Sequence, residues 1–247
     1  MHILLVNDDG IEAPGLRVLA QALGETHRIT VCAPDGNRSA VGHGITLHEP
    51  LLVGERQVPG AERAYGISGT PADCVRLGLG ALLGEPVDLV ISGPNIGLNV
   101  GMDLHYSGTV SAALEAAMQG VKALALSAPP MAEPREVVEI FLRILEQLDP
   151  QADISHALNI NLPALPLAEL KGVKWVPQGL FFPWEDTYEQ LDSSGQEFQY
   201  HVKGVEAAVS ADCATDVSAV INGWAAITPI TFRFTEAGEL PQKKFVL

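Results

Sequence analysis

Short apolar runs alternate with segments of helical periodicity from residue 2 to about residue 150, and this alternation limits the fold more than any other feature of the chain. Ile3–Val6 and Leu89–Ile91 are almost continuously apolar, as expected of strands buried on both faces. The pattern predicts a doubly wound, mostly parallel, Rossmann-like α/β sheet in three αβα layers. The expected strands are His2–Val6, Arg28–Ala33, Val87–Ile91 and Ala123–Ser127, and the expected helices are Pro14–Leu23, Pro71–Leu83, Thr109–Gln119 and Pro134–Leu148.

The pattern changes beyond about residue 156, where alternating segments such as Glu197–Val202 and Ala225–Ile230 indicate strands and hairpins. We expect residues 1–247 to form a single domain from which residues 173–208 project as a β-hairpin arm. Exposed sheet edges and large aromatic side chains tend to become covered, so we expect this arm to pair with a partner subunit.

The composition excludes several classes of partner. The chain has 247 residues, 30 acidic and 15 basic, and a net charge of -15, which disfavours nucleic-acid polymers and acidic membrane surfaces. No segment approaches the ~18 uncharged apolar residues of a membrane span. Three isolated cysteines without C-x-x-C spacing favour a reducing cytoplasm.

Polar clusters follow the predicted strands. Asp8 and Asp9 end the first strand before Gly10, Ser39 lies in the loop after the second strand, and Asn95 follows the strand near Val90. Because ligands of open α/β sheets bind outside the carboxyl ends of the strands, we expect these side chains to meet at one edge. Each residue alone is equally consistent with turn formation or loop hydrogen bonding.

The chemistry of these side chains indicates a hard metal ion. Carboxylate, hydroxyl and amide oxygens suit Mg²⁺, Mn²⁺ or Ca²⁺ better than zinc, which prefers His and Cys. Ser107-Gly108-Thr109 begins an alanine-rich helix, so free amides and two hydroxyls can face an anion there, although ordinary capping explains the same residues. Together these clusters predict a metal and phosphate site.

Several longer motifs resemble the SurE family, the survival-protein-E nucleotidases. The resemblance spans most of residues 1–128 and recurs more weakly around Thr215-Asp216 and Gly223–Pro229. The matching motifs are Val6–Ile11 with Ala13–Leu16, Ala33-Pro34 leading to Asn37-Arg38-Ser39, Gly69–Val75, Ser92–Gly101 and Tyr106–Val110.

The resemblance implies a cytoplasmic hydrolase of nucleoside 5′- and 3′-monophosphates, with short polyphosphate as a further substrate. It implies one divalent cation, Mg²⁺ or Mn²⁺, held by the positions matching Asp8, Asp9, Ser39 and Asn95, of which Asp8 and Asp9 are also the expected catalytic residues. It also implies homodimers or homotetramers formed through β arms and exchanged C-terminal segments. The positions matching a phosphate-binding turn are Ser107, Gly108 and Thr109, with Asn95 beside them.

Other positions bear on substrate binding. We expect Asn37, Arg38 and His43 to contact the substrate and His105 to protonate the leaving oxygen, the alternative for both imidazoles being a solvated loop histidine. The chain departs from the family pattern at residues 179–186, which are apolar and then acidic rather than basic and aromatic. This difference bears on substrate breadth and on the geometry of the arm.

Two other functions fit parts of the pattern. A haloacid-dehalogenase-like phosphatase also uses an aspartate after its first strand, but its D-x-D motif fails here because Gly10 occupies the second acidic position. A non-catalytic metal or nucleotide sensor would keep the same pocket and bind a protein partner through the arm. Release of phosphate beyond stoichiometry distinguishes the enzyme from the sensor.

Overall fold

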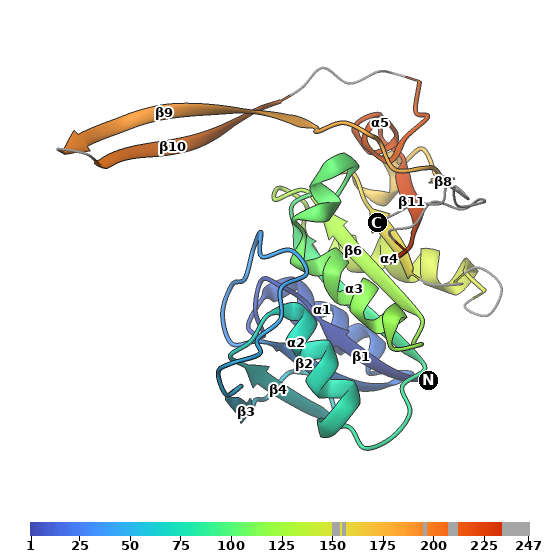
Figure 1. The fold of residues 1–247 in the computed structure, drawn as a ribbon. Helices are drawn as coiled ribbons and strands as arrows, with labels where there is room; N and C mark the ends of the chain where they lie inside the picture. The colour runs from blue at the N-terminus through green and yellow to red at the C-terminus, as the bar shows by residue number, and fades with distance from the viewer. Residues whose placement is uncertain (150–153, 155–156, 195–196, 207–211, 234–247) are drawn as a thin grey trace, which may run out of the picture.

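The computed structural model describes residues 1–149, 154, 157–194, 197–206 and 212–233, and its centre is a nine-stranded sheet (Figure 1). The strand order is β3-β4-β2-β1-β5-β6-β7-β11-β8. The strands are β1 His2–Val6, β2 Arg28–Pro34, β3 Val53–Glu55, β4 Arg63–Ile67, β5 Leu89–Ile96, β6 Ala123–Ala128, β7 Ala157–Asn161, β8 Val173–Trp175 and β11 Ala225–Ile230.

Most strand pairs are parallel, which confirms the predicted sheet. Strands β4, β2, β1, β5, β6 and β7 run in one direction, whereas β3 and β11 lie antiparallel to β4 and β7. The chain proceeds outward from β1 through β2 to β4, and then resumes on the other side of β1 with β5. The point between β1 and β5 is therefore the topological switch point, where sheets of this kind bind their ligands.

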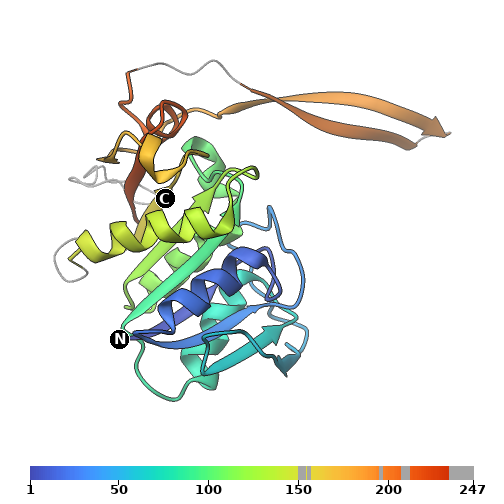
Figure 2. The same ribbon diagram turned by 180° about the vertical axis from the view of Figure 1, so that it is seen from behind.

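Helices cover both faces of the sheet (Figures 1 and 2). Alternate residues of β1 point to opposite faces: Ile3 and Leu5 join the core under α1 and α4, whereas Leu4 and Val6 join the core under α2 and α3. The helices are α1 Pro14–Leu23, α2 Pro71–Leu77, α3 Gly108–Met118, α4 Pro134–Gln147 and α5 Asp216–Ile221, with short helical turns η1 Gly78–Leu82, η2 Gly101–His105 and η3 Leu167–Glu169.

The start of α2 shows how local sequence sets these boundaries. The Thr70 side chain accepts a hydrogen bond from the Asp73 amide, and the Asp73 carboxylate accepts one from the Thr70 amide, which completes a capping box before Pro71. The helix predicted to reach Leu83 ends at Leu77, and the wider turn η1 follows it. None of the described helices combines the length and apolarity needed to cross a membrane.

The arm is an antiparallel hairpin of β9 Trp184–Ser194 and β10 Glu197–Glu206, and it extends well away from the body of the molecule (Figure 1). The predicted excursion began at residue 173, but Val173–Trp175 forms β8, which pairs with β11 in the main sheet. The projecting hairpin is therefore shorter than residues 173–208. The predicted exchanged C-terminal segment falls largely on residues 234–247, which lie outside the described residues.

Candidate active site

The turn after β1 brings Asp8 and Asp9 to the switch point. Asn7 brackets the turn, because its amide nitrogen donates to the Gly10 carbonyl (2.8 Å) and its oxygen accepts from the Gly10 amide (3.2 Å). Gly10 has φ +103°, and a β-carbon there would lie 3.2 Å from the carbonyl carbon of Gly36. Glycine is required at this bend, which lets two adjacent carboxylates emerge at one edge of the sheet.

Asp8 is buried against the start of α3. Its Oδ1 accepts a 2.6 Å hydrogen bond from the Thr109 hydroxyl. Burial raises the pKa of Asp8 to about 6; the hydrogen bond from Thr109 opposes this rise and the charge of Asp9 adds to it. Burial and the neighbouring charge of Asp9 make the ionised form of Asp8 unfavourable. A bound cation would offset this cost, because its positive charge stabilises both carboxylates.

Asp9 connects the same edge to β5. Its Oδ2 accepts a 3.1 Å hydrogen bond from the Ile96 amide. Burial raises the pKa of Asp9, and the Ile96 amide partly offsets that effect. Because Ile96 directly follows Asn95, this bond brings Asn95 to the edge that holds Asp9.

Asn95 lies inside β5 rather than beyond its end, in an irregular stretch where the pairing with β6 shifts between Ser92 and Asn95. Its amide nitrogen donates to the Gly97 carbonyl (2.8 Å). That bond fixes the amide group and leaves the Oδ1 oxygen as its ligating atom.

Ser39 reaches the site on an exposed loop. The amide of the preceding residue, Arg38, donates to the Asp8 carbonyl (2.7 Å), and the Ser39 amide donates to the Asn37 side-chain oxygen (2.9 Å). The Arg38 guanidinium donates to the Ser68 carbonyl (3.1 Å). The loop backbone just before Ser39 therefore contacts the backbone of Asp8, while the Asn37 and Arg38 side chains have partners within the protein.

The residues predicted to bind phosphate form the first turn of α3. Ser107 caps the helix by accepting from the Val110 amide (3.0 Å), and its own hydroxyl proton stays free to donate. The Thr109 hydroxyl donates to Asp8 instead of facing an anion. The Ser107 hydroxyl and the first amides of α3, which have no acceptor within the helix, are the groups left for phosphate.

The two candidate histidines are not hydrogen-bonded to the carboxylate pair in the described part of the chain. His43 Nε2 is 3.0 Å from a carboxylate oxygen of buried Glu115, which also accepts from Arg76 (3.2 Å) and Gln119 (3.0 Å). His105 is exposed at the end of η2. No hydrogen bond among the described residues joins either imidazole to Asp8 or Asp9.

Sequence reasoning missed a buried asparagine cluster behind Asn95. Asn159 and Asn161 of β7 both donate to the Asn99 carbonyl, at 2.8 and 2.9 Å, and Asn99 donates to the Ser127 hydroxyl at 2.8 Å. These bonds hold the loop that leaves β5. The sequence does contain a sign of this cluster. Two asparagines stand two residues apart on an otherwise apolar strand, and residues at that spacing share one face, where they can bind a common partner.

The donor set fits a divalent cation. Two half-buried or buried carboxylates, an oriented amide oxygen and a hydroxyl supply hard oxygen ligands, which Mg²⁺ and Mn²⁺ accept. No group of three or more His, Cys, Asp or Glu side chains suited to sharing an ion occurs in the described part of the chain, so two carboxylates would need help from Ser39 and Asn95.

Comparison with known proteins identifies the family of the chain. Residues 3–182 match the family model described as survival protein SurE. The chain is 40% identical to the "5'-nucleotidase SurE" of Thermoanaerobacter sp. (strain X514), covering 96% of this chain and 94% of the relative. It is 41% identical to the protein of the same name from Synechococcus sp. (strain JA-3-3Ab), covering 93% and 91%.

A solved structure of a SurE protein has the same fold as this chain. The SurE protein from Aquifex aeolicus superimposes with a TM-score of 0.82 at 35% identity and covers 95% of each chain. The family match, over residues 3–182, includes the residues that form the sheet edge described above. The chain therefore belongs to the survival protein SurE family.

Proposed function

We propose that this chain hydrolyses nucleoside 5′- and 3′-monophosphates to nucleosides and inorganic phosphate, with one Mg²⁺ or Mn²⁺ ion held by Asp8, Asp9, Ser39 and Asn95. The observation that carries the proposal is the 2.6 Å bond from Thr109 to Asp8, because it joins the candidate metal ligands to the helix start that suits phosphate. The name "5'-nucleotidase SurE" of the relatives supports the nucleoside monophosphate as the substrate class.

The protein groups have distinct roles in the proposed reaction. The Ser107 hydroxyl and the amides of Gly108 and Thr109 bind phosphate oxygens at the positive end of α3. The Asp9 carboxylate, oriented by the Ile96 amide, positions the attacking water in line with the leaving oxygen. When bound, the cation supplies charge neutralisation of the phosphate and lowers the pKa of water.

The size of the required rate acceleration explains why several groups act on one phosphate. Phosphate monoesters are among the slowest substrates, and enzymes accelerate such reactions by up to about 10²¹-fold. One oriented donor to a developing charge contributes roughly 10² to 10³ in rate. No single group of the site accounts for the whole rate acceleration. We propose that the Ser107 turn and the carboxylate pair each contribute part of it.

We further propose that the protein works in the cytoplasm as a homodimer or homotetramer assembled through the arm. The hairpin carries large exposed side chains, including Tyr188, Leu191 and Phe198, which are 59 to 66% exposed. Apolar groups gathered on an isolated hairpin are typical of an interface. Buried Cys32 and Cys74 carry free thiols, as expected in a reducing compartment.

The test is phosphate release from a panel of 5′- and 3′-nucleoside monophosphates, an aryl phosphate and tripolyphosphate, with Mg²⁺ or Mn²⁺ and with chelator. We expect catalytic release from the nucleotides, its loss in chelator, and its loss in Asp9→Asn, which keeps the size of the side chain but removes its charge. Glu139→Gln, which breaks an exposed ion pair with Arg143 on α4, is the matched control and retains full activity.

Two outcomes contradict the proposal. Turnover by Asp9→Asn with an unchanged metal requirement would remove Asp9 from the ligand set. Binding of nucleotide and metal by the wild-type protein without release beyond stoichiometry would favour the sensor function instead.

A further inference from the structure

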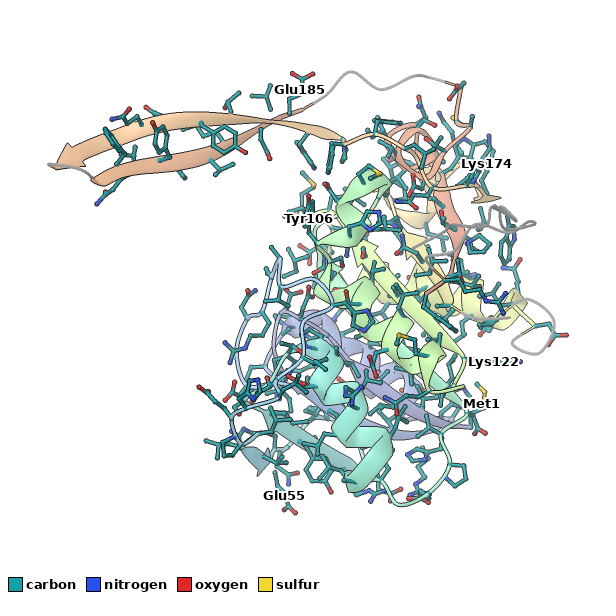
Figure 3. The ribbon with its side chains drawn as sticks, in the orientation of Figure 1. Met1, Glu55, Tyr106, Lys122, Lys174 and Glu185 are labelled. Atoms are coloured by element: carbon teal, nitrogen blue, oxygen red, sulfur yellow. The ribbon has the colours of Figure 1, made fainter. Side chains whose placement is uncertain are left out.

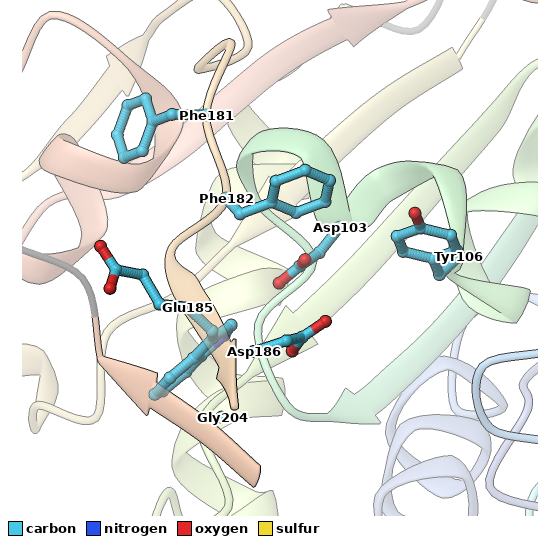
Figure 4. A pocket seen from close by; sticks show the side chains of 8 residues that line it. Asp103, Tyr106, Phe181, Phe182, Glu185, Asp186 and Gly204 are labelled. Carbon is cyan, nitrogen blue, oxygen red and sulfur yellow. The ribbon is translucent and has the colours of Figure 1, made fainter. Parts of the chain in front are cut away.

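A large cavity lies beside the phosphate turn, between η2 and the base of the arm, with a volume of about 1030 Å³. Asp103 of η2 and the following Tyr106 form one wall, and Phe182, just before the arm, and Asp186 of β9 form the other (Figure 4). Trp184, the first residue of β9, also lines the cavity. Figure 3 shows Tyr106 on the body of the molecule, below the part of the arm that carries Glu185. Because Tyr106 directly precedes Ser107, the cavity begins one residue from the group proposed to bind phosphate.

The two walls of the cavity are fastened together. Buried Asp216 accepts hydrogen bonds from the amides of Gly101 (3.0 Å), at the start of η2, and of Gly179 (2.8 Å), in the segment leading to the arm. The Met102 amide also donates to the Phe181 carbonyl (3.1 Å). These bonds connect η2 to the segment that leads into the arm, and so they connect the two walls of the cavity.

Aromatic faces form one part of the lining. The rings of Tyr106 and Phe182 lie 6.3 Å apart between centroids with an interplanar angle of 19°. Tyr106, Phe182 and Trp184 are 57%, 46% and 46% exposed, so each aromatic side chain keeps accessible surface for contact with a ligand ring. Nucleobases stack on such faces, with a contribution of about 1–3 kcal/mol per base.

Carboxylates form the other part. Asp103, Glu185 and Asp186 line the cavity, and the described residues of its lining include no Lys, Arg or His. Burial raises the pKa of Asp103, and the nearby charge of Asp186 raises it further, in agreement with the closeness of these two side chains in Figure 4. Carboxylates accept hydrogen bonds and repel anions, so this lining suits a neutral group that carries N–H donors.

We propose that this cavity binds the base of the nucleoside monophosphate, stacked on the aromatic faces, with Asp186 and Asp103 accepting hydrogen bonds from an exocyclic amino group. This inference rests on the proposed phosphatase function and adds to it a preference among nucleobases. Bases with an amino group are preferred over bases with a carbonyl at the same position, and substrates that place a second phosphate in the cavity are disfavoured.

The test compares substrates that differ by one group. AMP differs from IMP, and CMP from UMP, in an amino group replaced by a carbonyl oxygen. We expect kcat/KM to favour AMP over IMP and CMP over UMP by about tenfold, the effect of one hydrogen bond to a charged group. Asp186→Asn brings both ratios close to one, because an amide can donate to the carbonyl as readily as it accepts from the amino group.

Asp186 is exposed, so its replacement leaves the core intact, and Glu139→Gln on α4 is a control carboxylate outside the cavity. Calorimetric binding of adenosine and inosine, which lack phosphate, tests the cavity without catalysis. Hydrolysis of all four nucleotides with equal kcat/KM, together with equal binding of the two nucleosides, overturns the inference and leaves the proposed function standing. Absence of hydrolysis with tighter binding of adenosine overturns the proposed function alone.

Discussion

Gly108 lies where the start of α3 approaches Asp8 closely. A β-carbon placed there would lie 3.0 Å from the Cβ of Asp8, 3.1 Å from its Oδ2 and 3.1 Å from Pro71. Alanine is the better helix former, so helical propensity does not explain the glycine. The absence of a side chain allows the helix start to approach Asp8 closely enough for Thr109 to donate to it.

We therefore predict that Gly108→Ala weakens divalent-metal binding about tenfold, the effect seen when groups that orient a metal ligand are disturbed. Isothermal titration with Mn²⁺ measures this change. Gly80→Ala is the control, because a β-carbon on Gly80 meets no atom within 4 Å. Equal Mn²⁺ affinity in wild type and Gly108→Ala would show that the close approach has no bearing on the metal.

At the level of elements, the loop that carries Ser39 is held by contacts to several parts of the fold. The Gly42 amide donates to the Tyr106 carbonyl (3.0 Å), the Thr46 amide donates to Asp73 (3.0 Å), and His43 pairs with Glu115. The Glu115 carboxylate is buried and binds Arg76 of α2 as well. It is a positioning residue, because it joins the loop, α2 and α3 without touching the proposed substrate.

We predict that Glu115→Gln lowers the free energy of unfolding by about 1–2 kcal/mol, less than a fully buried charged hydrogen bond contributes, because Arg76 and His43 are partly exposed. It also raises the metal concentration needed for half-maximal activity, since the loop with Ser39 loosens. Urea denaturation and metal titration of activity measure the two effects. Stability lost with unchanged metal activation would reduce Glu115 to a structural role.

Local patterns predicted most helices and strands, because the order of apolar residues within each element shows which of its faces is buried. In β1, for example, Ile3 and Leu4 pack on opposite faces of the sheet. The contacts of the site were not predictable in this way. Thr109 and Asp8 are 101 residues apart, and Glu115 and His43 are 72 apart. The strand Val173–Trp175 was assigned to the arm because a three-residue edge strand has the same local alternation as a hairpin strand.

At the level of the whole molecule, hydrogen bonds connect the candidate site to the base of the arm. Asp216 of α5 binds both η2 and the segment that leads into β9, and η2 leads directly into the Ser107 turn. The hairpin beyond this junction packs mainly on itself, since β9 and β10 form a separate two-stranded sheet. Two-stranded hairpins are marginally stable alone, and this is one reason for our proposal that the arm packs against a partner subunit.

We predict that Leu191→Lys combined with Phe198→Lys lowers the assembly state, because charged groups on the hairpin oppose its burial in an interface. Light scattering after size-exclusion chromatography gives the mass of the assembly. Met131→Lys is the control, since Met131 is an exposed apolar side chain on the body of the molecule. An unchanged mass in the double variant would exclude this part of the arm from the interface.

The most direct test of the account is a crystal grown with Mn²⁺ and inorganic phosphate, with the manganese located by anomalous scattering. The account predicts a single strong peak per subunit within coordination distance of Asp8, Asp9, Ser39 and Asn95, and a phosphate on the Ser107–Thr109 turn. A peak held by other residues, or a phosphate bound away from the start of α3, would contradict it.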